Sequence, residues 1–90
     1  MFKINNLIIK QEKFYYEETK ERFFYKIIKS NSYIGLQLNN REEIDSIFKE
    51  LEKEKLIFFL DDKEENIKEI IVSFTTEYNN NPVLTIFFYK

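Results

Sequence analysis

The chain has 90 residues, of which 43% are apolar and 18% aromatic, and it carries a net charge of −2 with no cysteine or histidine. This length predicts a single domain over residues 1–90, and the aromatic content excludes an intrinsically disordered chain. The absence of cysteine excludes disulfide and thiolate chemistry and favours a cytoplasmic location, while the longest apolar run, Leu56–Leu60, is too short to cross a bilayer.

The first forty residues predict strands. Phe2–Lys10 alternates imperfectly between apolar and polar side chains and is interpreted as one strand. Lys13–Glu18 is interpreted as a second strand rather than the start of a helix, because Tyr and Phe pack well on a pleated surface. Glu21–Ser30 and Tyr33–Asn39 flank the turn-forming pair Asn31-Ser32, so we expect these two segments to form a hairpin.

The stretch Asn40–Leu56 predicts an amphipathic helix. Four apolar residues fall at helical spacing and form one stripe: Ile44, Ile47, Phe48 and Leu51. Asn40 occupies the N-cap position, and Glu43 follows three residues later, as in a capping box. The apolar block Leu56–Leu60 fits either a last helical turn or a short strand, and we favour continuation of the helix toward Phe59.

The last third of the chain predicts a charged loop at Asp61–Asn66 and then a second hairpin. Ile67–Tyr78 and Val83–Tyr89 have the composition of strands, and the segment Asn79–Pro82 between them is a strong turn signal. The resulting order, ββββ-α-ββ, predicts an α+β fold. In this fold one amphipathic helix packs on one face of an antiparallel β-sheet of five to six strands.

The residues that could carry chemistry do not indicate an enzyme. Histidine and cysteine are the commonest general base and soft metal ligands, and both are missing. A single glycine excludes a glycine-rich phosphate loop and a dinucleotide-binding fingerprint. The acidic segment Asp61–Glu65 lacks the alternating ligands and central glycine of a calcium loop. We therefore expect no catalytic residue, no cofactor and no metal site.

The apolar side chains outnumber those that one helix can cover. The residues expected on the uncovered face of the sheet are Phe24, Ile28, Ile71, Leu84, Ile86 and Phe88. Closure of the sheet, a partner protein or a second copy must cover such a face. The favoured partner-binding strand alternates cations with apolar groups: Arg22, Phe24, Lys26 and Ile28. Phe24 fits a core position equally well. The alternative binding surface is an acidic, water-facing side of the helix with Glu43, Glu50 and Glu54.

The distribution of charge leaves alternative functions open. Residues 1–40 have a balance of +3 and residues 41–69 a balance of −5, so nucleic-acid binding and DNA mimicry are both alternatives to protein binding. The favoured interpretation is a small non-enzymatic module that binds a protein or itself, and a homodimeric structural or regulatory subunit is a further alternative. We expect no association with a membrane.

In size and composition the chain is similar to small proteins of phages and mobile elements, among them anti-CRISPR proteins. This resemblance implies an inhibitor that occludes a surface of a host defence complex in the cytoplasm of the producing or host cell. The resemblance involves no motif, and it assigns no role to a particular residue.

Overall fold

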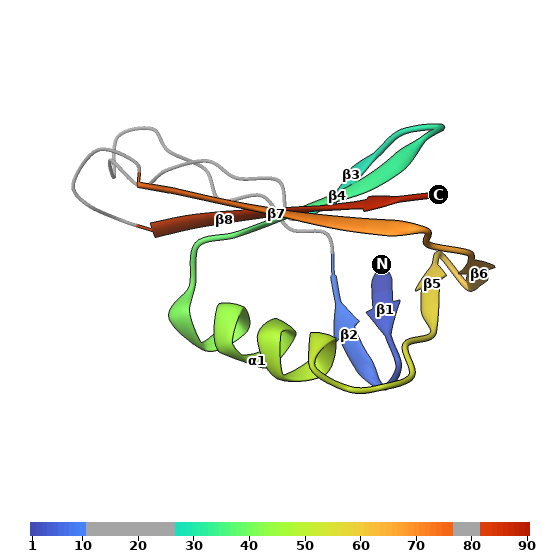
Figure 1. Ribbon diagram of the computed structural model, residues 1–90, viewed down its shortest axis with the longest axis horizontal. Coiled ribbons are helices and arrows are strands. Elements are labelled where there is room, and N and C mark those ends of the chain that lie inside the picture. The colour runs from blue at the N-terminus through green and yellow to red at the C-terminus, as the bar shows by residue number, and fades with distance from the viewer. Residues whose placement is uncertain (11–26, 77–81) are drawn as a thin grey trace.

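The computed structural model describes residues 1–10, 27–76 and 82–90, which form two four-stranded antiparallel sheets and one helix (Figure 1). The elements are β1 (Phe2–Ile4), β2 (Leu7–Ile9), β3 (Ile27–Lys29), β4 (Tyr33–Leu38), α1 (Arg41–Leu51), β5 (Phe58–Leu60), β6 (Lys63–Glu65), β7 (Glu69–Thr76) and β8 (Pro82–Tyr89). The smaller sheet has the order β2-β1-β5-β6 and the larger sheet the order β3-β4-β8-β7. The predicted α+β class is confirmed, but the strands are divided between two sheets.

The larger sheet makes one layer of the molecule, and α1 with β1, β2 and β5 makes a second layer against one of its faces (Figure 1). Buried residues from both layers form a single apolar core. The predictions for residues 11–26 and 77–81, including the strand at Lys13–Glu18 and the turn after Tyr78, lie outside the described residues.

Helix α1 begins where the sequence predicts it and ends earlier than expected. The side-chain oxygen of Asn40 accepts hydrogen bonds from the backbone N–H groups of Glu42, at 2.8 Å, and Glu43, at 3.3 Å, which caps the helix. The helix ends at Leu51, so the predicted continuation through Leu56–Leu60 is wrong, and that block contributes strand β5. All four residues after Leu51 are charged, and a further turn would therefore bury no apolar side chain.

The apolar stripe of α1 is only partly covered. Ile44 and Ile47 are buried and Leu51 is half-buried, whereas 38% of Phe48 is exposed. The predicted stripe therefore contributes Ile44 and Ile47 fully to the core, whereas Phe48 lies at the side of the packed face. With its eleven residues α1 is about half the length that a bilayer requires, and the described part of the chain contains no helix able to cross a membrane.

The larger sheet presents one apolar face to the second layer. β3 and β4 form the predicted hairpin around Asn31-Ser32, and β7 and β8 form the predicted antiparallel pair. Residues that lie opposite each other on β4 and β8 project from the same face. Six of them are buried: Ile34, Leu36, Leu38, Leu84, Ile86 and Phe88. The prediction that the last three lie on an uncovered face is wrong, because α1 and the smaller sheet cover them.

The smaller sheet contains two tight hairpins. The predicted single strand Phe2–Lys10 is two strands, joined by Asn5 and Asn6, and the φ of 52° at Asn5 is a positive value that asparagine tolerates. Asp61 and Asp62 join β5 to β6 with φ values of 49° and 68°, the pattern of a type I′ turn. The predicted loop Asp61–Asn66 therefore includes a strand, β6.

Three aromatic rings join the two sheets. The ring centroid of Phe88 in β8 lies 5.0 Å from that of Phe2 in β1 and 5.5 Å from that of Phe58 in β5. Phe2 and Phe58 stack on each other at 6.1 Å, and all three side chains are buried. Burial of each ring contributes roughly 1.5–3 kcal/mol to the free energy of unfolding. This cluster is therefore a main apolar connection between the layers.

The carboxylate of Asp61 connects the β5–β6 turn to two cations. It pairs with the Nζ of Lys29 in β3 and, at 2.8 Å, with the terminal ammonium group of Met1. These hydrogen bonds, that of Lys29 being the stronger cause, lower the pKa of Asp61 to about 2. Because the folded pKa is below the ordinary value of 3.8, this pairing stabilises the fold above pH 3.8, and its contribution is lost as the pH falls toward 2.

We expect Lys29→Gln to raise the pKa of Asp61 toward 3.8, because the variant loses the stronger of the two partners. An NMR titration of the side-chain carboxyl group measures this shift. Lys63→Gln removes a cation from the same hairpin and serves as the control, with an unchanged pKa expected. A pKa of Asp61 that is the same in the parent and in Lys29→Gln would show that the Lys29 pair does not form in solution.

Candidate protein-interaction surface

Strand β7 forms one edge of the larger sheet as far as the described strands go. It is the last strand in the order β3-β4-β8-β7, and it pairs with β8 along its whole length from Glu69 to Thr76. In an antiparallel pair, alternate residues direct their backbone N–H and C=O groups away from the neighbouring strand. No other described strand pairs with the far side of β7. Within the part of the chain that the structure describes, these backbone groups are therefore open to another strand.

The inner face of β7 extends beyond α1 and the smaller sheet, which bury the same face of β4 and β8. Ile70, Val72 and Phe74 lie directly opposite buried residues of β8 and project from the same face. Ile70 is half-buried, but 44% of Val72 and 59% of Phe74 are exposed. The core face of the sheet thus reaches the molecular surface at this edge.

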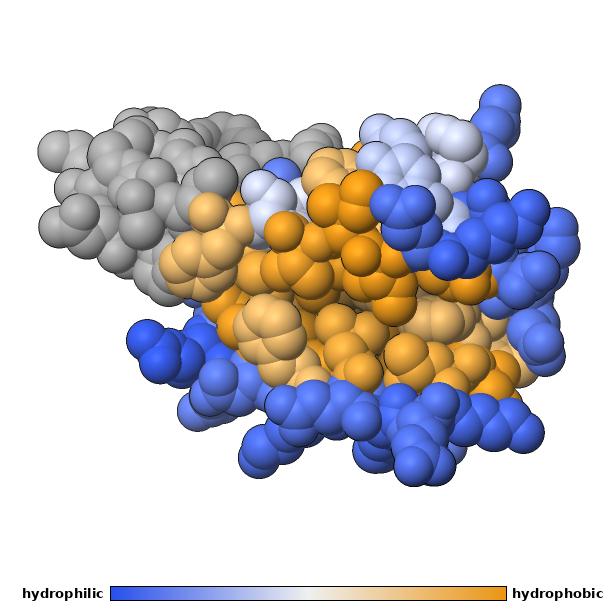
Figure 2. Space-filling view, viewed as in Figure 1, coloured by the Kyte–Doolittle hydropathy of each residue, from blue (hydrophilic) through white to orange (hydrophobic). Residues whose placement is uncertain are grey.

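Phe74 and the first turns of α1 border a hollow of about 240 Å³. Its lining residues are Arg41, Ile44, Asp45, Phe48 and Phe74. We call the exposed apolar side chains on this side of the molecule, Phe48, Val72 and Phe74, the β7 flank. Figure 2 shows an apolar band between the sheet and the helix, with hydrophilic side chains along its lower rim.

The β7 flank carries no charge at its centre. No residue from Ile70 to Phe74 is charged, and the hollow adds one cation, Arg41, and one anion, Asp45. An apolar centre with a polar rim is the usual anatomy of a protein–protein interface. A nucleic-acid surface instead requires a cluster of cations that can neutralise phosphates. The chemistry of the flank therefore suits a protein partner.

The predicted partner-binding strand is only partly described. Arg22, Phe24 and Lys26 lie outside the described residues, and their role as a binding surface stays a prediction. Ile28 lies in β3 opposite Gly35 of β4, and its Cβ is 3.1 Å from the place that a Cβ on Gly35 would occupy. The half-buried Ile28 side chain therefore fills the space above Gly35. Among the described strands, β3 and β7 lie at opposite ends of the larger sheet, so Ile28 and the β7 flank belong to different surfaces.

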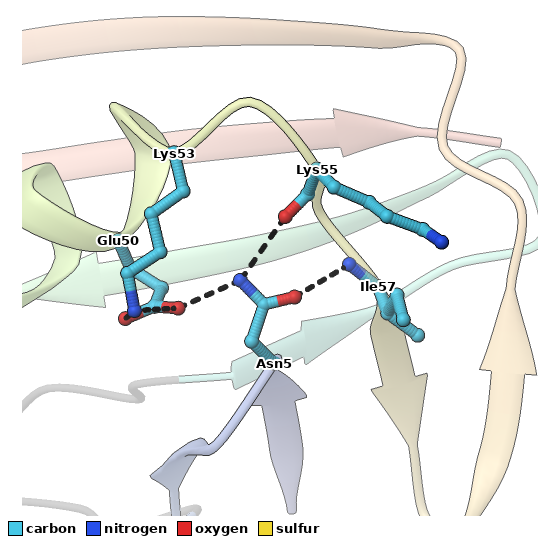
Figure 3. Close-up of polar contacts among 5 residues, drawn as sticks. All are labelled: Asn5, Glu50, Lys53, Lys55 and Ile57. Carbon is cyan, nitrogen blue, oxygen red and sulfur yellow. Dashed lines mark hydrogen bonds and ion pairs between the residues drawn. The ribbon is translucent and has the colours of Figure 1, made fainter.

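The predicted acidic side of α1 is not a single surface. Glu50 is buried, so the prediction that it faces water is wrong. The Nδ2 of Asn5 donates a hydrogen bond of 2.7 Å to the Glu50 carboxylate, and Lys53 pairs with the same carboxylate at 3.0 Å (Figure 3). Glu43 is half-buried, and Glu54 is exposed beyond the end of the helix. The three carboxylates therefore lie in three different environments.

Asn5 connects Glu50 to the loop between α1 and β5. Its Oδ1 accepts a hydrogen bond of 2.9 Å from the N–H of Ile57 (Figure 3). The backbone N–H of Asn5 also donates to the Ile57 carbonyl, at 2.8 Å. The hydrogen bond from Asn5, followed by that from Lys53, lowers the pKa of Glu50. Glu50 is therefore held as a carboxylate by groups that fix the end of the helix, which is a structural role.

A second hollow, of about 230 Å³, lies between α1 and the β2 edge of the smaller sheet. Its lining residues are Leu7, Ile8, Ile9, Leu38, Glu42, Glu43 and Ser46. Ile8 is 52% exposed here. This edge is three residues long, whereas β7 offers eight, so β7 provides the longer surface for a partner.

The sequence shows a surplus of apolar residues and places Ile71 of β7 within it, but it does not indicate that Val72 and Phe74 are exposed as well. The signal that could have indicated this exposure is the uncharged run from Ile70 to Phe74, which has large apolar groups on both faces of the strand. Such a run also fits a central strand that is buried on both sides. Only the order of the strands distinguishes an edge strand from a central strand, and β7 lies at an end of that order.

Within the described residues, no group of three or more acidic, histidine or cysteine side chains could hold a metal ion. Asp61, which the sequence places in the most acidic loop, is instead paired with two ammonium groups. Comparison of the chain with protein-family models, with curated proteins and with solved structures finds no match.

Proposed function

We propose that this chain is a small non-enzymatic module that binds a protein through the β7 flank. The observation that carries the proposal is the exposure of Val72 and Phe74 on the face that elsewhere forms the core. Contiguous apolar surface beside an unpaired strand edge is costly in water, and a protein partner that covers it recovers this free energy. Phe48 and Phe74 belong to the aromatic class that is enriched in protein interfaces.

A module of this kind acts by occupying a surface of its partner. The similarity in size and composition to phage and mobile-element inhibitors, including anti-CRISPR proteins, makes a host defence complex the first class of partner to test among proteins other than the chain itself. Nucleic-acid binding and DNA mimicry receive less support, because the flank has no cluster of cations and the predicted acidic side of α1 is divided.

Replacement of Phe74 by aspartate tests the proposal. We expect the variant to lose about 2 kcal/mol or more of binding free energy, roughly thirtyfold in Kd, because it truncates a central aromatic side chain and places a charge against apolar surface. The tagged chain, produced in its native cells, first identifies co-purifying proteins. Calorimetry with the purified partner then measures the Kd of the parent and of the variant.

Ile8→Asp is the matched control, since Ile8 is about as exposed as Phe74 but lies on the other sheet. We expect this variant to bind within twofold of the parent. Both variants must retain the circular dichroism spectrum and the melting temperature of a folded chain. Equal affinity of the parent and Phe74→Asp for every confirmed partner would place the binding surface elsewhere.

A further inference from the structure

We infer that the partner of the β7 flank is a second copy of this chain, which pairs antiparallel with β7 and joins the two larger sheets into one. This inference rests on the proposed function, because it names the partner of the same surface. Eight residues at a rise of about 3.4 Å give β7 an edge roughly 27 Å long. Addition of a strand to such an edge uses backbone hydrogen bonds that are already oriented.

Two-fold symmetry makes this edge self-complementary. Closed two-fold dimers are the commonest oligomers, and an axis perpendicular to the sheet relates two antiparallel copies of the same strand. Such an axis keeps the inner faces of both copies on the same side. With the axis at Val72, that residue meets Val72 of the second copy, and Ile70 meets Phe74 of the second copy. The exposed apolar side chains thus cover one another.

The charges on this side of the molecule also suit a second copy. Each copy brings one cation, Arg41, and one anion, Asp45, to the rim of the hollow, so both signs are present on both sides. The residues that would pair between the two copies, Ile70 to Phe74, are all uncharged, so the pairing places no like charges opposite each other. A partner that is strongly acidic or strongly basic would leave one of the two rim charges facing its own sign.

β7 lacks the features by which edge strands prevent self-association. Such strands are usually short, or they carry lysine, proline, a bulge or an inward-pointing charge. β7 pairs with β8 in unbroken register, and it has no charged residue or proline between Ile70 and Thr76. At the other described edge, the structure gives residues Ile27–Lys29 of β3, which include the charged Lys29. Among the described edge strands, β7 is therefore the longest one at which a second copy can pair.

The size of the contact sets the expected affinity. A strip roughly 27 Å long and 10 Å wide, with Phe48 and the helix rim added, is smaller than the roughly 800 Å² per partner of a standard interface. We therefore expect a dimer with a Kd in the micromolar range. Light scattering on the full chain should show a molar mass that rises from monomer to dimer over roughly 1–300 μM.

Charge substitution at the symmetry axis tests the geometry. In Val72→Lys and in Val72→Glu, each copy would meet its own charge across the axis, so we expect both variants to remain monomeric. An equimolar mixture of the two should recover dimer, because lysine then lies opposite glutamate. Ile8→Lys adds the same charge away from the edge and should dimerise like the parent.

A cysteine at the axis gives a second, independent measurement. The chain has no native cysteine, so every disulfide-linked dimer of a single-cysteine variant reports the introduced position. Opposed residues of antiparallel strands have Cα atoms about 4.5–5.5 Å apart, within the range of a disulfide. We expect Val72→Cys to form linked dimers readily under mild oxidation, and Ile8→Cys, which is similarly exposed, to form few.

The results separate this inference from the proposed function. Loss of dimer in both charge variants, with recovery in the mixture, supports the inference. A chain that is monomeric throughout, yet binds a different protein in a manner that depends on Phe74, overturns the inference and leaves the proposed function in place. A monomer with no Phe74-dependent partner overturns both. A dimer that persists in both charge variants and links better through Ile8→Cys than through Val72→Cys overturns the β7 pairing.

Discussion

Phe88→Ala is expected to lower the free energy of unfolding by about 3–5 kcal/mol. Phe88 is fully buried, and its ring contacts those of Phe2 and Phe58, which belong to the other sheet. The substitution therefore leaves a cavity at the junction of the two layers rather than within one of them. Because domains of this kind are stable by only about 5–15 kcal/mol, the loss is a large fraction of the total.

Phe87→Ala is the matched control. Phe87 is the preceding residue of the same strand, but its ring lies on the opposite face of the sheet, 5.4 Å from that of Tyr33, and it is half-buried. We expect a loss of roughly 1–2 kcal/mol, since less apolar area returns to water. Urea denaturation followed by circular dichroism measures both variants. Equal losses at the two positions would contradict the assignment of Phe88 to the junction.

Asn5→Ala is expected to have the second-largest effect, about 1.5–3.5 kcal/mol in the free energy of unfolding. The N–H of Ile57 loses its acceptor, which costs about 0.5–1.5 kcal/mol, and an alanine at a φ of 52° adds about 1–2 kcal/mol of strain. The carboxylate of Glu50 also loses a hydrogen bond. Asn5→Gly retains the loss of hydrogen bonds but removes the strain, because glycine adopts positive φ freely.

The pH dependence separates the role of Glu50 from that of the backbone. The folded pKa of Glu50 lies below the ordinary value of 4.5, so its contribution to stability is present above pH 4.5 and is lost as the pH falls through the folded pKa. In Asn5→Gly the loss of stability at acid pH should be smaller than in the parent. The variant lacks the side-chain hydrogen bond from Asn5, which is the largest cause of the lowered pKa of Glu50. Asn6→Ala, at the exposed neighbouring position, should unfold like the parent at each pH. If the free energy of unfolding of Asn5→Gly falls with acid pH as steeply as that of the parent, Asn5 does not lower the pKa of Glu50.

Local signals in the sequence were sufficient for the longer elements. The cap at Asn40, the turn at Asn31-Ser32 and the apolar composition of β8 lead to α1, the β3–β4 hairpin and the last strand. Each of these elements is specified mainly by residues that are close together in the sequence, so the sequence pattern is enough to predict it. The α+β class follows from their order along the chain.

The smaller sheet could not be predicted in the same way. Its strands are three residues long, too short for alternation to distinguish a strand from a helical turn or a loop. The burial of Glu50 depends on Asn5, which reaches it from a distant hairpin, and periodicity along α1 assigns Glu50 to water. The exposure of the β7 flank depends on strand order, which neither composition nor spacing specifies.

The pairing of β1 with β5 also determines the order in which the chain can fold. Phe2 lies opposite Leu60 and Ile34 lies opposite Phe88, so the β1–β5 and β4–β8 ladders each close a long loop, and the formation of both must overcome a large loss of chain entropy. The β3–β4 and β7–β8 hairpins need only short loops and can form early. Until β1 docks, the apolar face of the larger sheet is uncovered beside the open edge of β7. Aggregation during refolding is therefore expected to compete with these two long-range pairings, and refolding yield should fall steeply as the concentration of chain increases.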